Sequence, residues 1–412
     1  MRFRVDPARV QAELDELARF SDDPAPAVKR VLYTPTDLEG RAYVRRLALE
    51  AGLEARVDPA GNAFYRLPGR ESGGVVGTGS HIDAIPNAGK LDGTVGVIGG
   101  VAALRAIRES GAVPRRPIEV IAFTSEEPTR FGIGCLGSRL MAGAIACERV
   151  RALRDAEGTP FEDARRAAGF EGALEDVRLP QDYFSAFVEL HVEQGPILEA
   201  EKLEIGAVTA IAAPASYRVR VLGEGGHAGG VLMPARRDAL CGASELVISL
   251  ERLVREVGGA DTVGTVGMLG VHPGAVNSIP SEVRFTIDLR DIDHARRERV
   301  WGAFIERMRE VSAARKLETS LEPINEDAPC LSDEAILLVI EASCRALGLS
   351  HKRMVSRAYH DTLFIARIAR TAMIFVPSRA GVSHRPDEHT PPEQIAHGVE
   401  VLASTLYALA DR

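Results

Sequence analysis

The chain contains four short, continuous apolar stretches that each run into histidine or carboxylate side chains. They are VVGTGSHID (75–83), IEVIAFTSEE (118–127), AFVELHVEQG (186–195) and TAMIFVPSRAGVSH (371–384). A short apolar run without polar alternation is typical of a strand buried on both faces, as the strands of parallel sheets are. The carboxyl ends of parallel strands meet at one edge of an open α/β sheet, so the side chains that follow them are predicted to converge there. The pattern predicts an α/β fold with a site at that edge.

The converging side chains are three histidines and three carboxylates: His81, Asp83, Glu126, Glu127, His191 and His384. Such nitrogen and oxygen ligands suit Zn, Mn, Co or Ni and disfavour a structural thiolate zinc site. Asp92, in the loop NAGKLDG, makes the set large enough for two metal ions, and we predict that it bridges them. Asp83 lies two residues after His81, on the same side of extended chain, where it can orient the imidazole. Successive side chains of extended chain diverge, so one residue of the Glu126–Glu127 pair can bind metal while the other acts as general base.

Each of these residues has an ordinary alternative. A single histidine at a strand end is more often a hydrogen-bonded scaffold residue, and two adjacent glutamates often mark a helix N-terminus. The joint pattern favours the metal site over these alternatives. Competing catalytic motifs are absent from the sequence, which has neither a G-x-S-x-G nor an H-E-x-x-H pattern. The glycine-rich stretch 93–107 lacks the G-x-G-x-x-G spacing, so it predicts a helix packed on the sheet and not a dinucleotide loop.

Composition narrows the class of protein. With 412 residues, 45% of them hydrophobic, the chain can form two or three domains with ample core. The net charge of −8 argues against nucleic acid or an anionic membrane as the main partner. The five cysteines form no CxxC pair, which suits a reducing compartment. No apolar run approaches the roughly 18 residues of a membrane span, and the amino terminus has no signal core. We therefore expect a cytoplasmic protein.

The pattern of the chain changes near residue 213. From there to about residue 324, strand and helix patterns follow the order β-α-β-β-α-β, which is the ferredoxin-like plan. We expect this segment, 213–324, to be a domain inserted into a catalytic domain formed by 1–212 and 325–412. His384 follows the insertion, so the predicted ligands come from both parts of the catalytic domain.

Several runs resemble the hydantoinase/carbamoylase branch of the dinuclear metallo-amidases, which are related to metal aminopeptidases. They are GSHIDAIPNAGKLDG, SEEPTRFGIGCLGSRLMAG, HVEQGPILE, GGHAGGVLMPARRDA, NSIPSEVRFTIDLRD and GVSHRPDEHT, and the likeness runs from about residue 30 to the end. Within that branch, FTSEEPTRFGI, TAIAAPAS, DTVGTVGMLGVHPGAVNSIPS and SRAYHDTLFIARI most resemble the ureidoglycolate amidohydrolases. The resemblance implies two divalent ions, Mn or Zn, and a homodimer whose inserted domain is both lid and dimer interface.

The resemblance also assigns roles to individual residues. It implies five metal ligands, with Asp92 bridging: His81, Asp92, Glu127, His191 and His384. It implies Glu126 as the catalytic base, which agrees with the arrangement expected at the strand ends. No residue outside the four strand ends and the loop of Asp92 is needed for this ligand set.

Further residues are predicted to contact substrate. The resemblance implies that His227, in the loop GEGGHAGG, reaches the partner subunit's site and stabilises the oxyanion. The residue pattern alone, without the resemblance, favours an ordinary loop histidine. The resemblance also implies that Asn277 and Arg290 hold the substrate carboxylate and that Gln194 contacts the substrate. Arg290 lies on a polar strand face that is usually solvated, yet a guanidinium fork suits bidentate carboxylate recognition.

One departure bears on the substrate. In SRAYHD (356–361), Tyr359 precedes His360, where carbamoylases for larger amino acids typically have glycine before the HD pair. We predict that both residues line the substrate, with the phenol filling space and offering a hydroxyl, while simple packing is the alternative. A small ureido acid is expected, foremost (S)-ureidoglycolate, cleaved to glyoxylate, ammonia and carbon dioxide in purine breakdown. Alternatives are N-carbamoyl-L-amino acids, β-ureidopropionate and allantoate, or a non-catalytic binding relative.

Overall fold

The structure, a computed structural model, describes residues 2–412 and divides into two compact units. Unit 1 comprises the chain up to Thr209 together with Leu331–Ser356 and His360–Arg412. Unit 2 comprises Ala210–Cys330 and Arg357–Tyr359. Among the described residues, no helix combines the length and apolar character that crossing a membrane requires.

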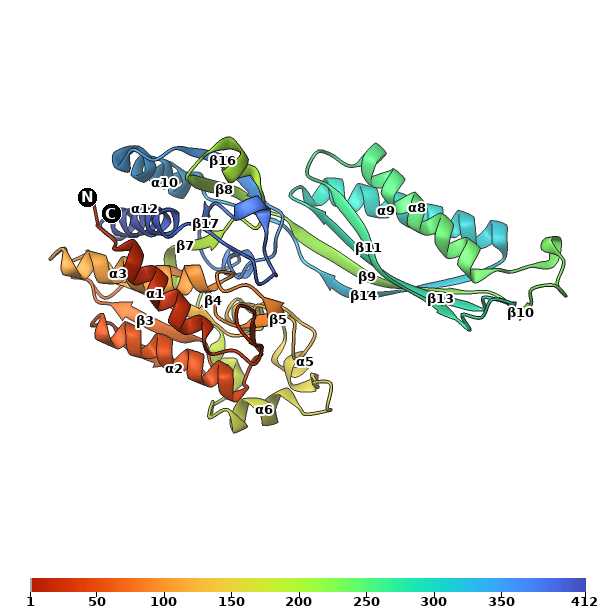
Figure 1. The fold of residues 1–412 in the computed structure, drawn as a ribbon, viewed down its shortest axis with the longest axis horizontal. Coiled ribbons are helices and arrows are strands. Elements are labelled where there is room, and N and C mark those ends of the chain that lie inside the picture. The colour runs from red at the N-terminus through yellow and green to blue at the C-terminus, as the bar shows by residue number, and fades with distance from the viewer. Residues whose placement is uncertain (1) are drawn as a thin grey trace. The chain divides into compact units, whose positions relative to one another are not determined.

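Unit 1 is built on a nine-stranded sheet whose centre confirms the expected parallel strands (Figure 1). Its four central strands, in spatial order, are β17 (Thr371–Val376), β7 (Phe184–Val192), β4 (Val75–His81) and β6 (Ile118–Phe123). Each is parallel to its neighbour and almost wholly buried, as continuous apolar runs predict. His81 pairs in register with Phe123, and His191 with Phe375, so the polar segments after these strands begin at the same edge.

The outer strands complete the sheet. On one side of the central four lie β8 (Ile205–Ile211), which pairs with β17, then β15 (Cys330–Leu331) and β16 (His351–Ser356), which both pair with β8. On the other side, β3 (Ala63–Leu67) and β2 (Glu54–Val57) continue antiparallel from β6. A separate antiparallel pair is formed by β1 (Val28–Arg30) and β5 (Ala84–Ala88).

Helices cover this sheet. The longest are α1 (Pro7–Ala18), α2 (Pro35–Glu50), α3 (Thr94–Glu109), α10 (Glu334–Leu347) and α12 (Pro392–Ala410). Helices α3 and α12 pack on each other and on β4 and β7. The glycines of α3 allow this close approach, since a Cβ at Gly96 would lie 2.4 Å from the carbonyl oxygen of Leu190. This finding confirms the packing interpretation of the glycine-rich stretch.

Short helical segments lie in the connections of unit 1. They are α4 (Leu136–Met141), α5 (Cys147–Ala152), α6 (Phe161–Ala167), η1 (Leu174–Val177), α7 (Ile197–Glu201), α11 (Thr362–Ile365) and η3 (Arg379–Gly381). Helix α11 contacts β7, β17 and α4, so the loops that follow β6 and β16 are held against the central strands.

Unit 2 has the order β9 (Ala213–Leu222), α8 (Ala239–Val257), β11 (Val263–His272), β13 (Glu282–Asp291), α9 (His294–Arg315), β14 (Glu318–Glu326). This order confirms the ferredoxin-like β-α-β-β-α-β plan, and the antiparallel sheet runs β11-β13-β9-β14. Strand β13 shows why one face packs on the helices: Val283, Phe285, Ile287 and Leu289 are buried and alternate with polar residues. A small pair, β10 (Gly226–His227) and β12 (Ser278–Ile279), and the short η2 (Met233–Ala235) complete the unit.

Candidate metal centre

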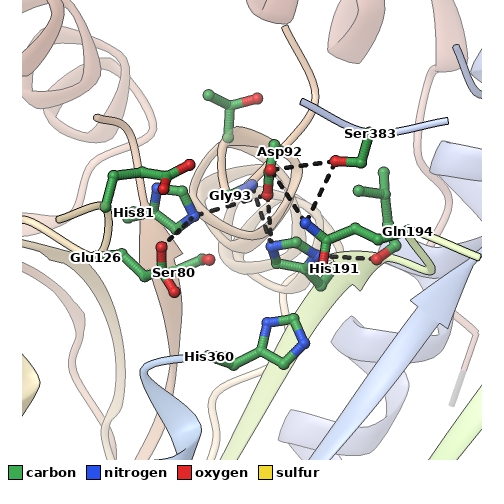
Figure 2. Close-up of polar contacts among 12 residues, drawn as sticks. Ser80, His81, Asp92, Gly93, Glu126, His191, Gln194, His360 and Ser383 are labelled. Atoms are coloured by element: carbon green, nitrogen blue, oxygen red, sulfur yellow. Dashed lines mark hydrogen bonds and ion pairs between the residues drawn. The ribbon is translucent and has the colours of Figure 1, made fainter. Parts of the chain in front are cut away.

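The polar side chains that follow the central strands of unit 1 gather in one place (Figure 2). His81 ends β4, His191 lies near the end of β7, and Glu126 and Glu127 follow β6. His384 follows β17 and η3, and Asp92 lies between β5 and α3. The convergence is a property of the parallel sheet, because the carboxyl ends of neighbouring strands share an edge.

Asp92 is the centre of the cluster, and its two carboxylate oxygens face different histidines. Its Oδ1 lies 3.2 Å from Nε2 of His191 and 3.8 Å from Nε2 of His81. Its Oδ2 lies 2.9 Å from Nε2 of His384, which is itself 3.5 Å from Oε1 of Glu127. Two potential ligand groups therefore share Asp92, namely His81–Asp92–His191 and Asp92–Glu127–His384, each with its ligand atoms within 4.8 Å of one another. This donor set fits two divalent cations joined by a carboxylate.

Asp83 links His81, a predicted ligand, to the two glutamates. Nδ1 of His81 lies 3.0 Å from the carbonyl oxygen of Asp83 and 3.6 Å from its Oδ1, so the other ring nitrogen is directed at Asp92. The same carboxylate accepts hydrogen bonds from the backbone amides of Glu126 (3.2 Å) and Glu127 (3.0 Å). A carboxylate in this position fixes both the ring and the loop after β6.

The backbone around the cluster is unusual. Gly93 has φ +67°, and a Cβ there would lie 2.4 Å from the imidazole of His81, so only glycine fits next to Asp92. Ser125, Gln194 and His384 have φ of 57°, 54° and 56°, a region that residues with a side chain adopt at a cost. Strained residues of this kind collect at functional sites, and here His384 is a predicted ligand, Gln194 is a predicted substrate contact and Ser125 directly precedes the predicted general base.

The electrostatics reflect a buried group of carboxylates. Burial raises the pKa of Glu126 well above its usual range, against the opposing charge of His81. Burial, with the charge of Asp92, raises the pKa of Glu127 to about 7. Burial also opposes ionisation of Asp92, but hydrogen bonds from His191 and His384 hold its pKa well below the usual range. Cations in this position would compensate the negative charge that these carboxylates carry.

The side chains of Glu126 and Glu127 have different neighbours. Glu127 faces His384 and belongs to a ligand group, whereas Glu126 belongs to neither group. Oε2 of Glu126 lies 3.8 Å from Nε2 of His81, and its Oε1 accepts a hydrogen bond from the thiol of Cys135 at 3.6 Å. The side chain is thus held beside the cluster, where a general base could reach a water molecule.

Gln194 and His360 differ in what they offer to a substrate. Nε2 of Gln194 donates to Oδ2 of Asp92 at 3.1 Å, and its buried Oε1 has no hydrogen-bond partner among the described residues. His360 is buried, its Nε2 lies 2.8 Å from the hydroxyl of Ser356, and its ring packs on that of His191 at 4.6 Å between centroids. In this structure His360 packs against the predicted ligand His191, and its contact with substrate stays a prediction.

Two further residues contact Asp92 and were not singled out from the sequence. The hydroxyl oxygen of Ser383 lies 3.2 Å from Oδ2 of Asp92, and Glu388 accepts a hydrogen bond from the Asp92 amide at 3.1 Å. A serine and a glutamate in a polar loop carry no distinguishing local pattern. Their proximity to His384 along the chain is the one signal that could have drawn attention to them.

The remaining predicted residues lie in unit 2, where His227 and Asn277 are neighbours. His227 in β10 pairs with Ser278 in β12, and the carbonyl oxygen of Asn277 accepts a hydrogen bond from the amide of Ala228 at 2.9 Å. The exposed ring of His227 accepts a hydrogen bond from the amide of Gly229 at Nδ1, 3.1 Å away. A neutral ring in this arrangement carries its proton on Nε2, where it can be donated.

Arg290 lies near the opposite end of β13 from this pair. Strand β13 begins at Glu282, shortly after β12, and the eight steps from residue 282 to residue 290 span about 27 Å at the usual rise per residue. Arg290 donates to Oδ1 of Asp288 at 2.7 Å and to the carbonyl oxygen of Arg357 at 3.1 Å. His227 and Arg290 of one chain are therefore too far apart to contact one small molecule.

Tyr359 belongs to unit 2 together with Arg357. Its hydroxyl donates a hydrogen bond to Oδ2 of the buried Asp327, and Arg357 pairs with Asp261 at 2.6 Å. The phenol is thus fixed within unit 2.

Known proteins are similar to this chain in sequence and in fold. The model of Peptidase family M20/M25/M40 matches residues 77–408. Ureidoglycolate hydrolase of Oryza sativa subsp. japonica is 50% identical, over 99% of this chain and 86% of that protein. N-carbamoyl-L-amino acid amidohydrolase of Geobacillus stearothermophilus is 39% identical, over 98% of each. The crystal structure of AtUAH in complex with glyoxylate superposes with a TM-score of 0.88 at 48% identity, covering 99% of each chain.

Proposed function

The chain belongs to the M20/M25/M40 peptidase family, and on that premise we propose that it is a metal-dependent amidohydrolase that cleaves (S)-ureidoglycolate. The observation that carries the chemistry is the pair of ligand groups that share Asp92. The identity of 50% to the rice ureidoglycolate hydrolase, over nearly the full chain, supports the substrate. The reaction would be a nitrogen-salvage step of purine breakdown, which we expect to take place in the cytoplasm.

We propose that two divalent ions, Mn or Zn, are held by the five residues His81, Asp92, Glu127, His191 and His384. Imidazole and carboxylate ligands suit both metals, and the resemblance to carbamoylases favours Mn. When bound, such ions polarise the ureido carbonyl and lower the pKa of water. Asp83 is not one of the proposed ligands. It orients the ligand His81 and accepts hydrogen bonds from the amides of Glu126 and Glu127.

Glu126 performs the proton transfers in this proposal. Its carboxylate accepts the proton of the attacking water as the water oxygen forms a bond with the ureido carbon. It then passes this proton to the leaving nitrogen as the ureido C–N bond breaks. With one water consumed, one ureidoglycolate ends as one glyoxylate, two ammonia molecules and one carbon dioxide.

The substrate carboxylate is proposed to bind Arg290 of one protomer and Asn277 of the other, because Asn277 is a neighbour of His227 and lies far from Arg290 within one chain. Gln194, Tyr359 and His360 are proposed to line the rest of the molecule. His227 donates its Nε2–H to the oxygen that gains negative charge in the transition state, which is a strong source of stabilisation. Arg290 lies about 27 Å along β13 from Glu282, whereas His227 lies in β10, which pairs with β12 just before the start of β13. The proposal therefore includes a homodimer in which His227 of each protomer completes the site of the other. Unit 2 would serve as lid and dimer interface.

A second candidate function uses the same metal site to hydrolyse an N-carbamoyl-L-amino acid. The 39% identity to the Geobacillus stearothermophilus amidohydrolase over almost the whole chain favours it. Tyr359 argues against it, because a phenol at this position occupies space that a larger substrate side chain needs. β-Ureidopropionate and allantoate are further ureido acids to compare. A non-catalytic binding protein would have no use for an intact ligand set and Glu126.

The deciding experiment is ammonia release from (S)-ureidoglycolate, its (R) enantiomer, N-carbamoyl-L-amino acids, β-ureidopropionate and allantoate. Each is assayed with enzyme reconstituted with Mn and with enzyme treated with a chelator. We expect a kcat/KM for (S)-ureidoglycolate that exceeds the others by at least about tenfold and is lost on chelation. A preference for a carbamoyl amino acid would overturn the substrate and keep the chemistry. Turnover that survives complete metal removal would overturn the chemistry.

A further inference from the structure

Glu388 connects two loops that carry predicted metal ligands. Its side chain is buried, with 4% of the residue exposed, whereas the carboxylate of its neighbour Asp387 is exposed. Oε2 of Glu388 accepts hydrogen bonds from the amides of Leu91 at 2.8 Å and Asp92 at 3.1 Å. Its Oε1 accepts a hydrogen bond from the hydroxyl of Ser383 at 2.9 Å.

The two loops are remote in sequence and meet only through such contacts of the folded chain. Asp92 lies in the loop before α3, and Ser383 directly precedes His384 in the loop after η3. A carboxylate whose two oxygens bind different loops sets the distance between them. The loops also pack closely at this point, since a Cβ at Gly89 would lie 2.4 Å from Oε2 of Glu388.

His384 needs such support more than the other predicted ligands do. Its side chain is 47% exposed, whereas those of His81 and His191 are 3% and 1% exposed. Its backbone has φ +56°, a conformation that the surrounding loop must maintain. The buried histidines are held by the packing of β4 and β7, but His384 depends on its loop.

We propose that Glu388 is a positioning residue that fixes the Asp92 loop against the His384 loop and so preforms the Asp92–Glu127–His384 group. The inference rests on the proposed metal site. Residues that support metal ligands typically contribute roughly 10–100-fold to metal affinity, because without them the ligands must be ordered when the metal binds. Glu388 would contact neither substrate nor metal, so its effect is on binding and on loop order.

The test compares Glu388→Ala with Glu388→Gln and with Asp387→Asn, a matched control that removes the adjacent, exposed carboxylate. A glutamine can still accept from the two amides with its oxygen, while its NH₂ group donates to the Ser383 hydroxyl. Two quantities are measured: the dissociation constants and stoichiometry for Mn, and the hydrogen exchange of the Leu91 and Asp92 amides in metal-free protein. The second needs no metal, so it tests the loop contact even if the proposed metal site is wrong.

We expect Glu388→Ala to weaken binding of one Mn ion by roughly 10–100-fold and to speed exchange of both amides. Glu388→Gln is expected to restore both properties to within a few fold, and Asp387→Asn to leave them unchanged. Wild-type Mn affinity at both positions in folded Glu388→Ala would overturn the inference. If the wild type binds no divalent ion, the proposed function fails instead.

Glu388→Asp provides a second route if Glu388→Ala does not fold. Aspartate keeps the charge but is one methylene shorter, so it cannot span both loops. A folded Glu388→Asp with weakened Mn binding supports the positioning role, and one with wild-type binding overturns it. A fold-stabilising role alone predicts a lowered Tm in the Glu388 variants without a selective loss of one ion.

Discussion

Nε2 of His384 lies 2.9 Å from Oδ2 of Asp92, although the two residues are far apart in the sequence. The other carboxylate oxygen, Oδ1, faces His191 and His81. One aspartate thus belongs to both potential ligand groups, whereas His384 belongs to one of them. This asymmetry leads to different expectations for substitutions at the two positions.

Asp92→Asn is expected to lose both metal ions, and His384→Ala to lose one. An amide offers one acceptor oxygen and no charge, so it cannot bridge two cations. We expect activity to fall by at least about 10³-fold in Asp92→Asn, because the metal contribution to catalysis is lost with the ions. Metal content after dialysis, measured by elemental analysis, distinguishes two, one and zero ions. Equal metal loss in both variants would contradict the bridging role.

Glu126→Gln is expected to abolish proton transfer while leaving the metal ions in place. General acid–base catalysis contributes roughly 10²–10⁴-fold, so kcat should fall by that factor. The neighbouring Glu127→Gln is the matched control, because it removes a predicted ligand and should lose metal as well as activity. Steady-state kinetics with metal analysis on both variants checks this. Loss of metal from Glu126→Gln would reassign that residue as a ligand.

Mixing His227→Ala with Arg290→Ala is expected to restore activity that each variant lacks alone. The two residues lie too far apart on one chain to serve one substrate, so a mixed dimer has one site with both residues intact. Random exchange makes half of the dimers mixed, and recovery should approach about a quarter of wild-type activity. The mixture is denatured, refolded and assayed beside each variant treated alone. No recovery in a mixture that forms dimers would refute a site shared between protomers.

Tyr359→Gly is expected to widen the range of substrates. Removal of the phenol opens space next to the substrate and breaks the hydrogen bond to Asp327. The ratio of kcat/KM for N-carbamoyl-L-amino acids to that for ureidoglycolate should rise by about tenfold or more. Tyr359→Phe keeps the ring and loses only the hydroxyl, so it should retain the wild-type preference. Unchanged preference in both variants would assign Tyr359 to packing.

The stability of unit 2 is expected to depend on pH through Glu282. Hydrogen bonds from Arg220 and Arg284 lower the pKa of Glu282 from 4.5 to about 2. A carboxyl with a lowered pKa in the folded state stabilises the fold above its unfolded pKa and loses this contribution as pH falls toward its folded pKa. Glu282→Gln should therefore lower Tm slightly at neutral pH, because exposed ion pairs contribute little, and the difference should shrink between about pH 4.5 and 2. A difference in Tm that grows on acidification would contradict the assignment.

Much of the fold was predictable because it is encoded locally. The four apolar runs correspond to β4, β6, β7 and β17, since a short run without alternation has few stable alternatives to a buried strand. The β-α-β-β-α-β order of unit 2 followed in the same way from strand and helix periods. Arg357–Tyr359 was not predictable, because three residues that pack with a distant segment leave no periodic signal.

The sequence by itself determined which side chains could gather around metal ions, because residues such as His81 and His191 directly end strands whose direction is set by the parallel sheet. Only the tertiary structure decided how they face one another: that Asp92 turns one oxygen to each group, and that Glu126 and Glu127 point to different neighbours. The tertiary structure also decided the contacts of Glu388 and the separation of His227 from Arg290. The physical reason is that a strand end depends on nearby residues, whereas contacts between remote loops depend on the packing of the whole chain.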